Sequence, residues 1–231
     1  MSSRLPLVNL PVPWRSTEPA RPRLSADLIV RTALDILVGE GIDAVTMRRV
    51  AHELGTGPAS LYAHVANKSE LHDLMYDRAL GAVEPPKPDA RRWRAQVKRL
   101  LSDQLAIMLA HPGIARVTWA TMIPVGPNVL RQGETLLALL RAGGLSTRRA
   151  AYAADALTLY TKAFAYEAGV WSSGELDQAE IAKRGAQTRA YLEANSEDWP
   201  NTLGAGELIT AETARERFAF GLDIMLRGLT R

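Results

Sequence analysis

The chain has 231 residues, of which 47% are hydrophobic and 23% charged, as in an ordinary globular protein. It contains no cysteine, which excludes disulfides, thiolate catalysis and cysteine-ligated zinc. No uninterrupted run of about 18 apolar residues predicts a transmembrane helix. The net charge of +3 is unevenly distributed, because residues 25–80 carry five basic and eight acidic residues, so bulk charge does not identify a nucleic-acid-binding protein. This composition favours a cytoplasmic protein with no membrane partner.

Residues 1–24 are predicted to form a disordered tail. Four prolines precede Pro22, and the segment lacks the continuous apolar stretch of a signal peptide. The tail carries four arginines and one acidic residue. It is therefore either a basic arm that adds a nonspecific, salt-sensitive contact to nucleic acid, or a segment without function.

Residues 25–80 are predicted to form four consecutive helices. Ser25 and Thr46 are placed to cap the first two, because each precedes apolar residues at helical spacing. Pro58 suits the first position of a short third helix, where its missing N–H would be unpaired in any case. Asn67 followed by Glu70 forms the capping-box pattern that opens the fourth helix. Glycines separate the second helix from the third, and this arrangement is the helix-turn-helix pattern.

The second and third of these helices have one apolar side and one polar side. The apolar residues expected to fix the crossing of the two helices are Val50, Ala51, Leu54, Leu61 and Val65. The side chains left facing outward include Ser60, Tyr62, Ala63 and His64. In a helix-turn-helix protein the second of the two helices enters the major groove, where hydroxyl and imidazole groups can reach phosphates or base edges. The alternative is an αα-hairpin inside a helical bundle.

The remainder of the chain is also predicted to be helical, so the fold class is all-α. The segment VEPPKPD breaks the chain after the fourth helix. The helices expected beyond it span about 89–110, 113–121, a segment ending at Gly143, 147–171 and 212–229. Residues 172–210 are polar and rich in glycine, and they are expected to hold at most one helix, around 181–192.

The region 25–80 resembles the N-terminal helix-turn-helix domain of TetR-family transcriptional repressors. The resemblance is carried by GIDAVTMRRVAHELG and by SLYAHVANKSEL, which is similar to the LYxHxxNKxxL signature of that family. In the C-terminal half, RRWRAQVKRLL, GLSTRRAAYAADALTLYTKAF and FAFGLDIMLRGL are similar to the tetracycline-repressor branch. The resemblance implies a ligand-binding and dimerisation domain over 81–231. It also implies a homodimeric repressor that binds a palindromic double-stranded DNA operator and is released by a small-molecule inducer.

The resemblance places DNA contacts at six positions of this sequence, namely Thr46, Arg48, Ser60, Tyr62, His64 and Lys68. Arg48 can form a bidentate bond to a guanine edge. Thr46, Tyr62 and Lys68 are suited to phosphates, and Lys68 lies at a helix N-terminus that itself favours an anion. Thr46 also serves as an N-cap, Tyr62 is alternatively a half-buried packing residue, and His64 could contact either a phosphate or a base. The tetracycline repressor has a bulky aromatic residue where Ala63 stands, so a different operator is expected.

The resemblance also implies an inducer site in the C-terminal half. The aligned residues are Gln104, Thr118, Trp119, Met122, Leu136, Tyr160, Phe164 and Glu167. Aromatic and apolar residues with a few polar groups are typical of ligand sites, although at helical spacing they are equally the residues of a plain core. Thr118 replaces a histidine that helps to hold magnesium–tetracycline, whereas Glu167 retains the acidic residue of the family. We therefore expect an aromatic or polycyclic inducer, and neither a metal nor a cofactor.

Two helices are expected to form the homodimer, those near 147–171 and 212–229. Alanines in the first permit close approach of a partner helix. The apolar stripe expected in the second consists of Phe218, Leu222, Met225 and Leu229. Two helices from each subunit would give a four-helix bundle. The alternative is that both helices serve only the core of the monomer.

Sequence signals for an enzyme are missing. His52 and Glu53 begin a zinc-protease pattern, but the second histidine is absent, and no phosphate loop, dinucleotide fingerprint or nucleophile elbow is present. The chain is therefore not expected to be an enzyme. The remaining alternative is a helical ligand-binding or partner-binding protein that does not bind DNA.

Overall fold

The computed structural model describes residues 23–120, 126–172, 177–206, 208, 210 and 212–229. Within them every regular element is a helix and no strand is present, which confirms the all-α fold class. The tail predicted over residues 1–24 falls almost entirely outside these residues, since the description begins at residue 23.

The N-terminal part contains four α-helices and one short 3-10 helix. They are α1 (Ala26–Glu40), η1 (Ile42–Ala44), α2 (Met47–Glu53), α3 (Pro58–Leu61) and α4 (Lys68–Leu80). The predicted caps are confirmed: the hydroxyl of Ser25 accepts a hydrogen bond from the Leu28 N–H at 3.2 Å. The side chain of Asn67 likewise accepts from the Glu70 N–H at 2.9 Å. The Glu70 carboxylate also reaches back across the start of α4, where it accepts a hydrogen bond from the N–H of Ala66, the residue before the cap.

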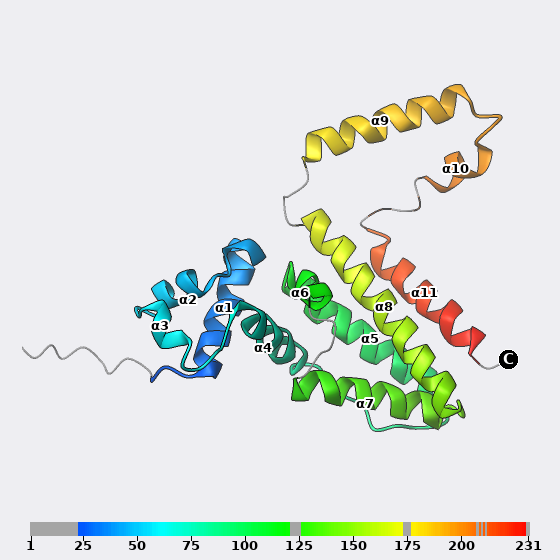
Figure 1. Ribbon diagram of the computed structural model, residues 1–231. Coiled ribbons are helices and arrows are strands. Elements are labelled where there is room, and N and C mark those ends of the chain that lie inside the picture. The colour runs from blue at the N-terminus through cyan, green and yellow to red at the C-terminus, as the bar shows by residue number, and fades with distance from the viewer. Residues whose placement is uncertain are drawn as a thin grey trace, which may run out of the picture.

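The C-terminal part forms a bundle with an outlying arm. Its helices are α5 (Trp93–Ala110), α6 (Ile114–Ala120), α7 (Pro127–Ala142), α8 (Thr147–Ser172), α9 (Gln178–Ala194), α10 (Pro200–Ala205) and α11 (Ala214–Gly228). Helices α5, α7 and α8 pack against one another, and α11 packs on α5 and α8 (Figure 1). Helices α9 and α10 contact each other and stand away from this bundle (Figure 1).

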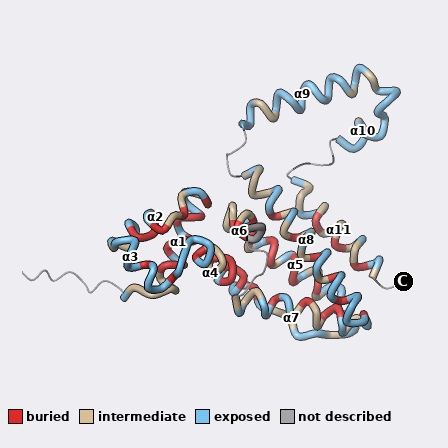
Figure 2. Tube along the Cα trace, in the orientation of Figure 1, coloured by how far each residue is buried: buried red, intermediate tan, exposed pale blue. Residues whose placement is uncertain are grey.

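The expectation of at most one helix over 172–210 was wrong, because the structure contains both α9 and α10 there. Asp177 caps α9 by accepting hydrogen bonds from two N–H groups of its first turn, and Pro200 opens α10. No residue of either helix is buried (Figure 2). A helix that buries no face needs no apolar stripe, so the periodicity on which the prediction relied is weak there.

A single apolar core runs through the described part of the chain, from α1 to α11. Helix α4 joins its two parts, since it packs against α1 on one side and against α5, α6 and α7 on the other. The boundary predicted between residues 80 and 81 coincides with the end of α4. The division into two domains stays a prediction, because the core is continuous across that point.

Buried polar side chains connect the C-terminal end of α4 to the bundle through hydrogen bonds. The Gln132 amide of α7 donates to the Val83 carbonyl at 2.8 Å and to the Leu80 carbonyl at 3.3 Å. The Gln104 amide of α5 in turn donates to the Gln132 side-chain oxygen at 3.4 Å. Because these groups are buried, losing one partner would leave another unsatisfied, which is costly.

Candidate nucleic-acid interface and regulatory site

Helices α2 and α3 cross on a small buried apolar contact. Val50, Ala51 and Leu61 are fully buried there, as predicted. Gly55 ends the turn of α2 with a φ of +62°, in the left-handed region that glycine enters without strain. The Thr56 N–H donates a hydrogen bond to the Ala51 carbonyl at 2.9 Å, and this bond stabilises the tight turn before α3. This packing holds the short α3 at a defined angle to α2.

The predicted contact residues lie on the outer side of this crossing. Ser60, Tyr62, His64 and Lys68 are all exposed, and the Tyr62 side chain is 53% exposed. Tyr62 therefore presents about half of its surface to solvent, and its role as a DNA contact stays a prediction. Helix α3 is only four residues long, so Tyr62 and His64 belong to the turn that follows it.

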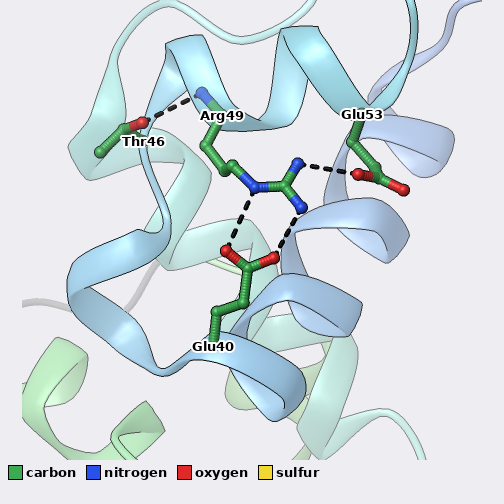
Figure 3. Close-up of polar contacts among 4 residues, drawn as sticks. All are labelled: Glu40, Thr46, Arg49 and Glu53. Atoms are coloured by element: carbon green, nitrogen blue, oxygen red, sulfur yellow. Dashed lines mark hydrogen bonds and ion pairs between the residues drawn. The ribbon is translucent and has the colours of Figure 1, made fainter.

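Two neighbouring arginines of α2 have different surroundings. The Arg49 guanidinium is held by Glu40 of α1, with N···O distances of 2.6 and 3.2 Å, and by Glu53 at 2.8 Å (Figure 3). Arg48 is exposed and makes no ion pair with any described residue. The Arg49 guanidinium therefore stabilises the contact between α1 and α2. The guanidinium of Arg48 has no acidic partner among the described residues, so its N–H groups can still donate to another molecule.

The Arg49 cluster also orients the start of α2. The Arg49 N–H donates to the Thr46 hydroxyl at 3.0 Å, so Thr46 is an N-cap as predicted (Figure 3). Hydrogen bonding to Arg49 lowers the pKa of Glu40 below its ordinary value of 4.5. The ion pair between Glu40 of α1 and Arg49 of α2 holds together the two helices on which the position of Arg48 depends.

The predicted ligand residues fall into two groups of contacts. Gln104 and Leu136 are buried in α5 and α7, where Gln104 contacts Gln132. Tyr160 and Phe164 of α8 instead pack on Phe218 of α11, with ring centroids 5.3 and 5.2 Å away. No hydrogen bond or ring contact among the described side chains joins the two groups.

The other four predicted ligand residues are Glu167, Thr118, Trp119 and Met122, and only the Glu167 side chain is described. Glu167 lies on α8 and is exposed. Thr118 and Trp119 belong to α6, but their side chains are outside the described part of the structure, and so is all of Met122. No group of three His, Asp or Glu side chains placed to hold a metal ion is found among the described residues.

Comparison with known proteins identifies the family. Residues 29–74 match the family described as bacterial regulatory proteins, tetR family, and residues 85–231 match the tetracyclin repressor-like C-terminal domain. The chain belongs to the TetR family of transcriptional regulators. Its N-terminal part is therefore a helix-turn-helix domain rather than a plain αα-hairpin. The protein is a transcriptional regulator rather than an enzyme.

Individual relatives agree with this assignment. A transcriptional repressor of Streptomyces coeruleorubidus, DrrR1, is 38% identical over 133 residues, which are 57% of this chain and 49% of DrrR1. The match thus spans about half the length of that relative. The class C tetracycline repressor of Escherichia coli is 26% identical over 90% of this chain and 92% of its own length.

The structure of this TetR-family regulator is also similar to solved structures. Apo ActR from Streptomyces coelicolor superposes with a TM-score of 0.79 and 40% identity, covering 91% of this chain and 96% of ActR. ActR in complex with actinorhodin gives a TM-score of 0.78 and 39% identity, over 90% of this chain and 95% of ActR. No helix in the described part of the chain is long and apolar enough to span a bilayer.

The apolar stripe expected to meet a partner subunit was assigned to the wrong residues of α11. Phe218 and Leu222 are buried in the core of the monomer, and Met225 and Leu229 are partly buried against it. The exposed apolar residues of α11 are instead Phe220 at 66% and Ile224 at 56%. Both sets have helical spacing, so periodicity alone could not tell which side of α11 faces the core.

Sequence reasoning also missed Arg49 and Gln132. The only local signal for the Arg49 cluster is Glu53, one turn later in α2. Its other partner, Glu40, precedes it by nine residues across a turn. The partners of Gln132 lie about 50 residues earlier, so no local sequence signal marks them.

Proposed function

We propose that this TetR-family regulator is a homodimeric repressor that binds a palindromic DNA operator and is released by a small aromatic or polycyclic inducer. The observation that carries the proposal is the exposed polar surface of the helix-turn-helix, where Arg48 has no ion pair with a described residue. An exposed arginine without such an ion pair, on the same helix-turn-helix as an exposed tyrosine and histidine, is suited to contact phosphates and base edges.

The six predicted DNA contacts would have separate roles. Arg48 would read a guanine edge, and His64 a base or a phosphate. Thr46, Ser60 and Tyr62 would position the protein through phosphates. Lys68 is the first residue of α4, where its charge adds to the positive end of the helix and favours a phosphate.

A second copy of the chain is the partner that fits the exposed apolar residues of α8 and α11. Tyr152, Leu159 and Tyr166 are exposed at seven-residue spacing along α8. Phe220 and Ile224 lie one turn apart on α11, which packs against α8 through Tyr160 and Phe218. Two such helices from each subunit would form a four-helix bundle. The two recognition surfaces would then meet half-sites about 34–36 Å apart, or a multiple of that distance.

The inducer would bind in the regulatory bundle and act on α4. The crystal structure of ActR with actinorhodin supports a small-molecule ligand for this chain. Gln132 joins α7 to the last carbonyl of α4 and to the Val83 carbonyl just after it, so a ligand that shifts α5, α6 or α7 would also shift α4. Release requires that the ligand bind the state without DNA more tightly, since equal affinity for both states changes nothing. Thr118 in place of a metal-ligating histidine favours binding without a metal.

Selection of bound sequences from random duplex DNA tests the repressor function. We expect enrichment of a palindrome, followed by its release in gel shifts when actinorhodin or an aromatic metabolite library is added without metal. Enrichment of no sequence would favour the alternative of a helical ligand-binding or partner-binding protein. If release required magnesium, the metal-free part of the proposal would be wrong.

A further inference from the structure

The face of α3 that points away from the fold has two alanines at its centre. Leu61 and Val65 are buried, at 0% and 1% exposure, and they anchor the inner side of this segment. The backbone stays in helical turns up to Val65, because Tyr62 has helical dihedral angles and the Val65 N–H donates to the Leu61 carbonyl at 2.9 Å. At about 3.6 residues per turn, Ala63 therefore lies opposite the two buried residues. Ala59 lies one turn earlier on the same side, and both alanines are exposed.

Side chains that can form hydrogen bonds lie beside the two alanines and not between them. By the same helical geometry, Ser60 and His64 lie on one side of the line through the alanines, and Tyr62 lies on the other. All three are exposed. The centre of the outward face, within this fully described segment, therefore presents methyl groups and no side-chain donor or acceptor.

The major groove of DNA offers one group that matches such a surface. The second helix of a helix-turn-helix enters this groove, and its exposed face meets the edges of the bases. Those edges carry hydrogen-bond donors and acceptors, and their apolar group is the 5-methyl group of thymine. An alanine cannot exchange a hydrogen bond with a base, but its Cβ atom can pack on that methyl group. A small side chain also allows the helix backbone to approach the bases closely.

We propose that Ala59 and Ala63 determine part of the operator sequence, and that each reads a thymine through contact between its Cβ atom and the thymine methyl group. This inference rests on the proposed operator binding and specifies the bases that α3 recognises. The two alanines are about 6 Å apart along the helix axis, so the two thymines are expected roughly two base-pair steps apart in each half-site. Arg48 belongs to α2 and is assigned to a guanine edge, so its hydrogen bonds are a separate source of specificity.

Gel shifts with the palindrome enriched from random duplex DNA test this readout, with deoxyuridine replacing one thymine at a time in both half-sites. Uracil pairs with adenine as thymine does and lacks only the methyl group. Burial of one such group is worth about fourfold in affinity, so its removal from both half-sites should weaken binding of the wild-type protein roughly fifteenfold. We expect this loss at the two thymine positions that the alanines contact.

Ala59→Gly and Ala63→Gly each remove one methyl group from the protein. Each variant should lose the preference for thymine over uracil at its own position and keep it at the other. The readout is the ratio of the affinities for the two duplexes, because a less stable helix would weaken binding to both duplexes alike. Ala66→Gly is the matched control, since Ala66 is an exposed alanine beyond the helical turns of α3, and its ratio should be unchanged.

The remaining outcomes separate this inference from the proposed function. A wild-type protein that binds the thymine and uracil duplexes equally at every position contradicts the inference, even if the glycine variants fail to fold. A thymine preference that survives in both glycine variants also contradicts it, because another side chain such as Tyr62 would then contact the methyl groups. In both cases the enriched palindrome would still support the repressor function. Enrichment of no palindrome would refute the proposed operator binding and this inference with it.

Discussion

The carboxylate of Asp77 in α4 accepts a hydrogen bond from the backbone N–H of Asn128 in α7 at 2.8 Å. The Val129 N–H donates to the same oxygen at 2.9 Å, and the Asn128 amide donates to the other oxygen. A buried side chain of α4 thus caps the N-terminus of α7 from another part of the chain. The Asp77 carboxylate lies so close to the backbone of Gly126 that a Cβ atom at position 126 would overlap it.

We predict that Asp77→Ala lowers the free energy of unfolding by about 1–3 kcal/mol, because it leaves two partly buried N–H groups without their acceptor. Asp77→Asn should cost less, since an amide oxygen can still accept. Urea denaturation of the three proteins measures the difference. A further expectation is that Asp77→Ala weakens the response of operator binding to inducer, because the link between α4 and α7 is lost. Equal stability of all three proteins would show that the cap is energetically unimportant.

Arg48→Ala should reduce operator affinity at least about tenfold, since a bidentate arginine–guanine contact is worth about 1–3 kcal/mol. Its thermal melting should be unchanged, because Arg48 makes no ion pair with a described residue. Arg49→Ala provides the contrast, with a lower melting temperature caused by loss of the contacts with Glu40 and Glu53. Gel shifts and melting curves of both variants decide the assignment. Unchanged DNA affinity in Arg48→Ala would remove Arg48 from the recognition surface.

Phe220→Glu combined with Ile224→Glu should convert the protein to monomers. Burying two carboxylates in an apolar interface is unfavourable, and loss of central contacts costs about 2 kcal/mol or more, roughly a 30-fold weaker dimer. Leu130→Glu is the matched control, because Leu130 is an exposed leucine of α7 outside the proposed interface. Sedimentation velocity reports the outcome. Intact dimers of the double variant would place the interface elsewhere.

The Glu40–Arg49 contact should contribute stability that depends on pH. The pKa of Glu40 is lowered in the folded protein by its hydrogen bonds to Arg49, relative to the ordinary value of 4.5. The unfolded state therefore binds the proton more readily, so the contribution is fully present above about pH 4.5 and is lost as the pH falls through the folded pKa. Comparing Glu40→Gln with the wild type by denaturation at pH 7 and pH 3 should show the difference shrinking at the lower pH. A constant difference would exclude the ion pair as its source.

Much of the fold follows from signals that act within a few residues. The caps at Ser25, Thr46 and Asn67 were predicted because each side chain bonds to an N–H three residues later. The exposed positions of Tyr62 and His64 followed from the spacing of the buried residues around them. The family was recognisable for the same reason, since its DNA-binding signature is a continuous stretch of sequence.

What only the tertiary structure decided are contacts between distant parts of the chain. Asp77 and Asn128 are 51 residues apart, and Lys162 meets Tyr76 across 86 residues. Which side of α11 faces the core was likewise settled by packing on α5 and α8, because its two apolar sides have similar periodicity. Local sequence determines where a helix begins and which residues share a face. The identity of the neighbour against which that face is buried depends on the packing of the whole chain.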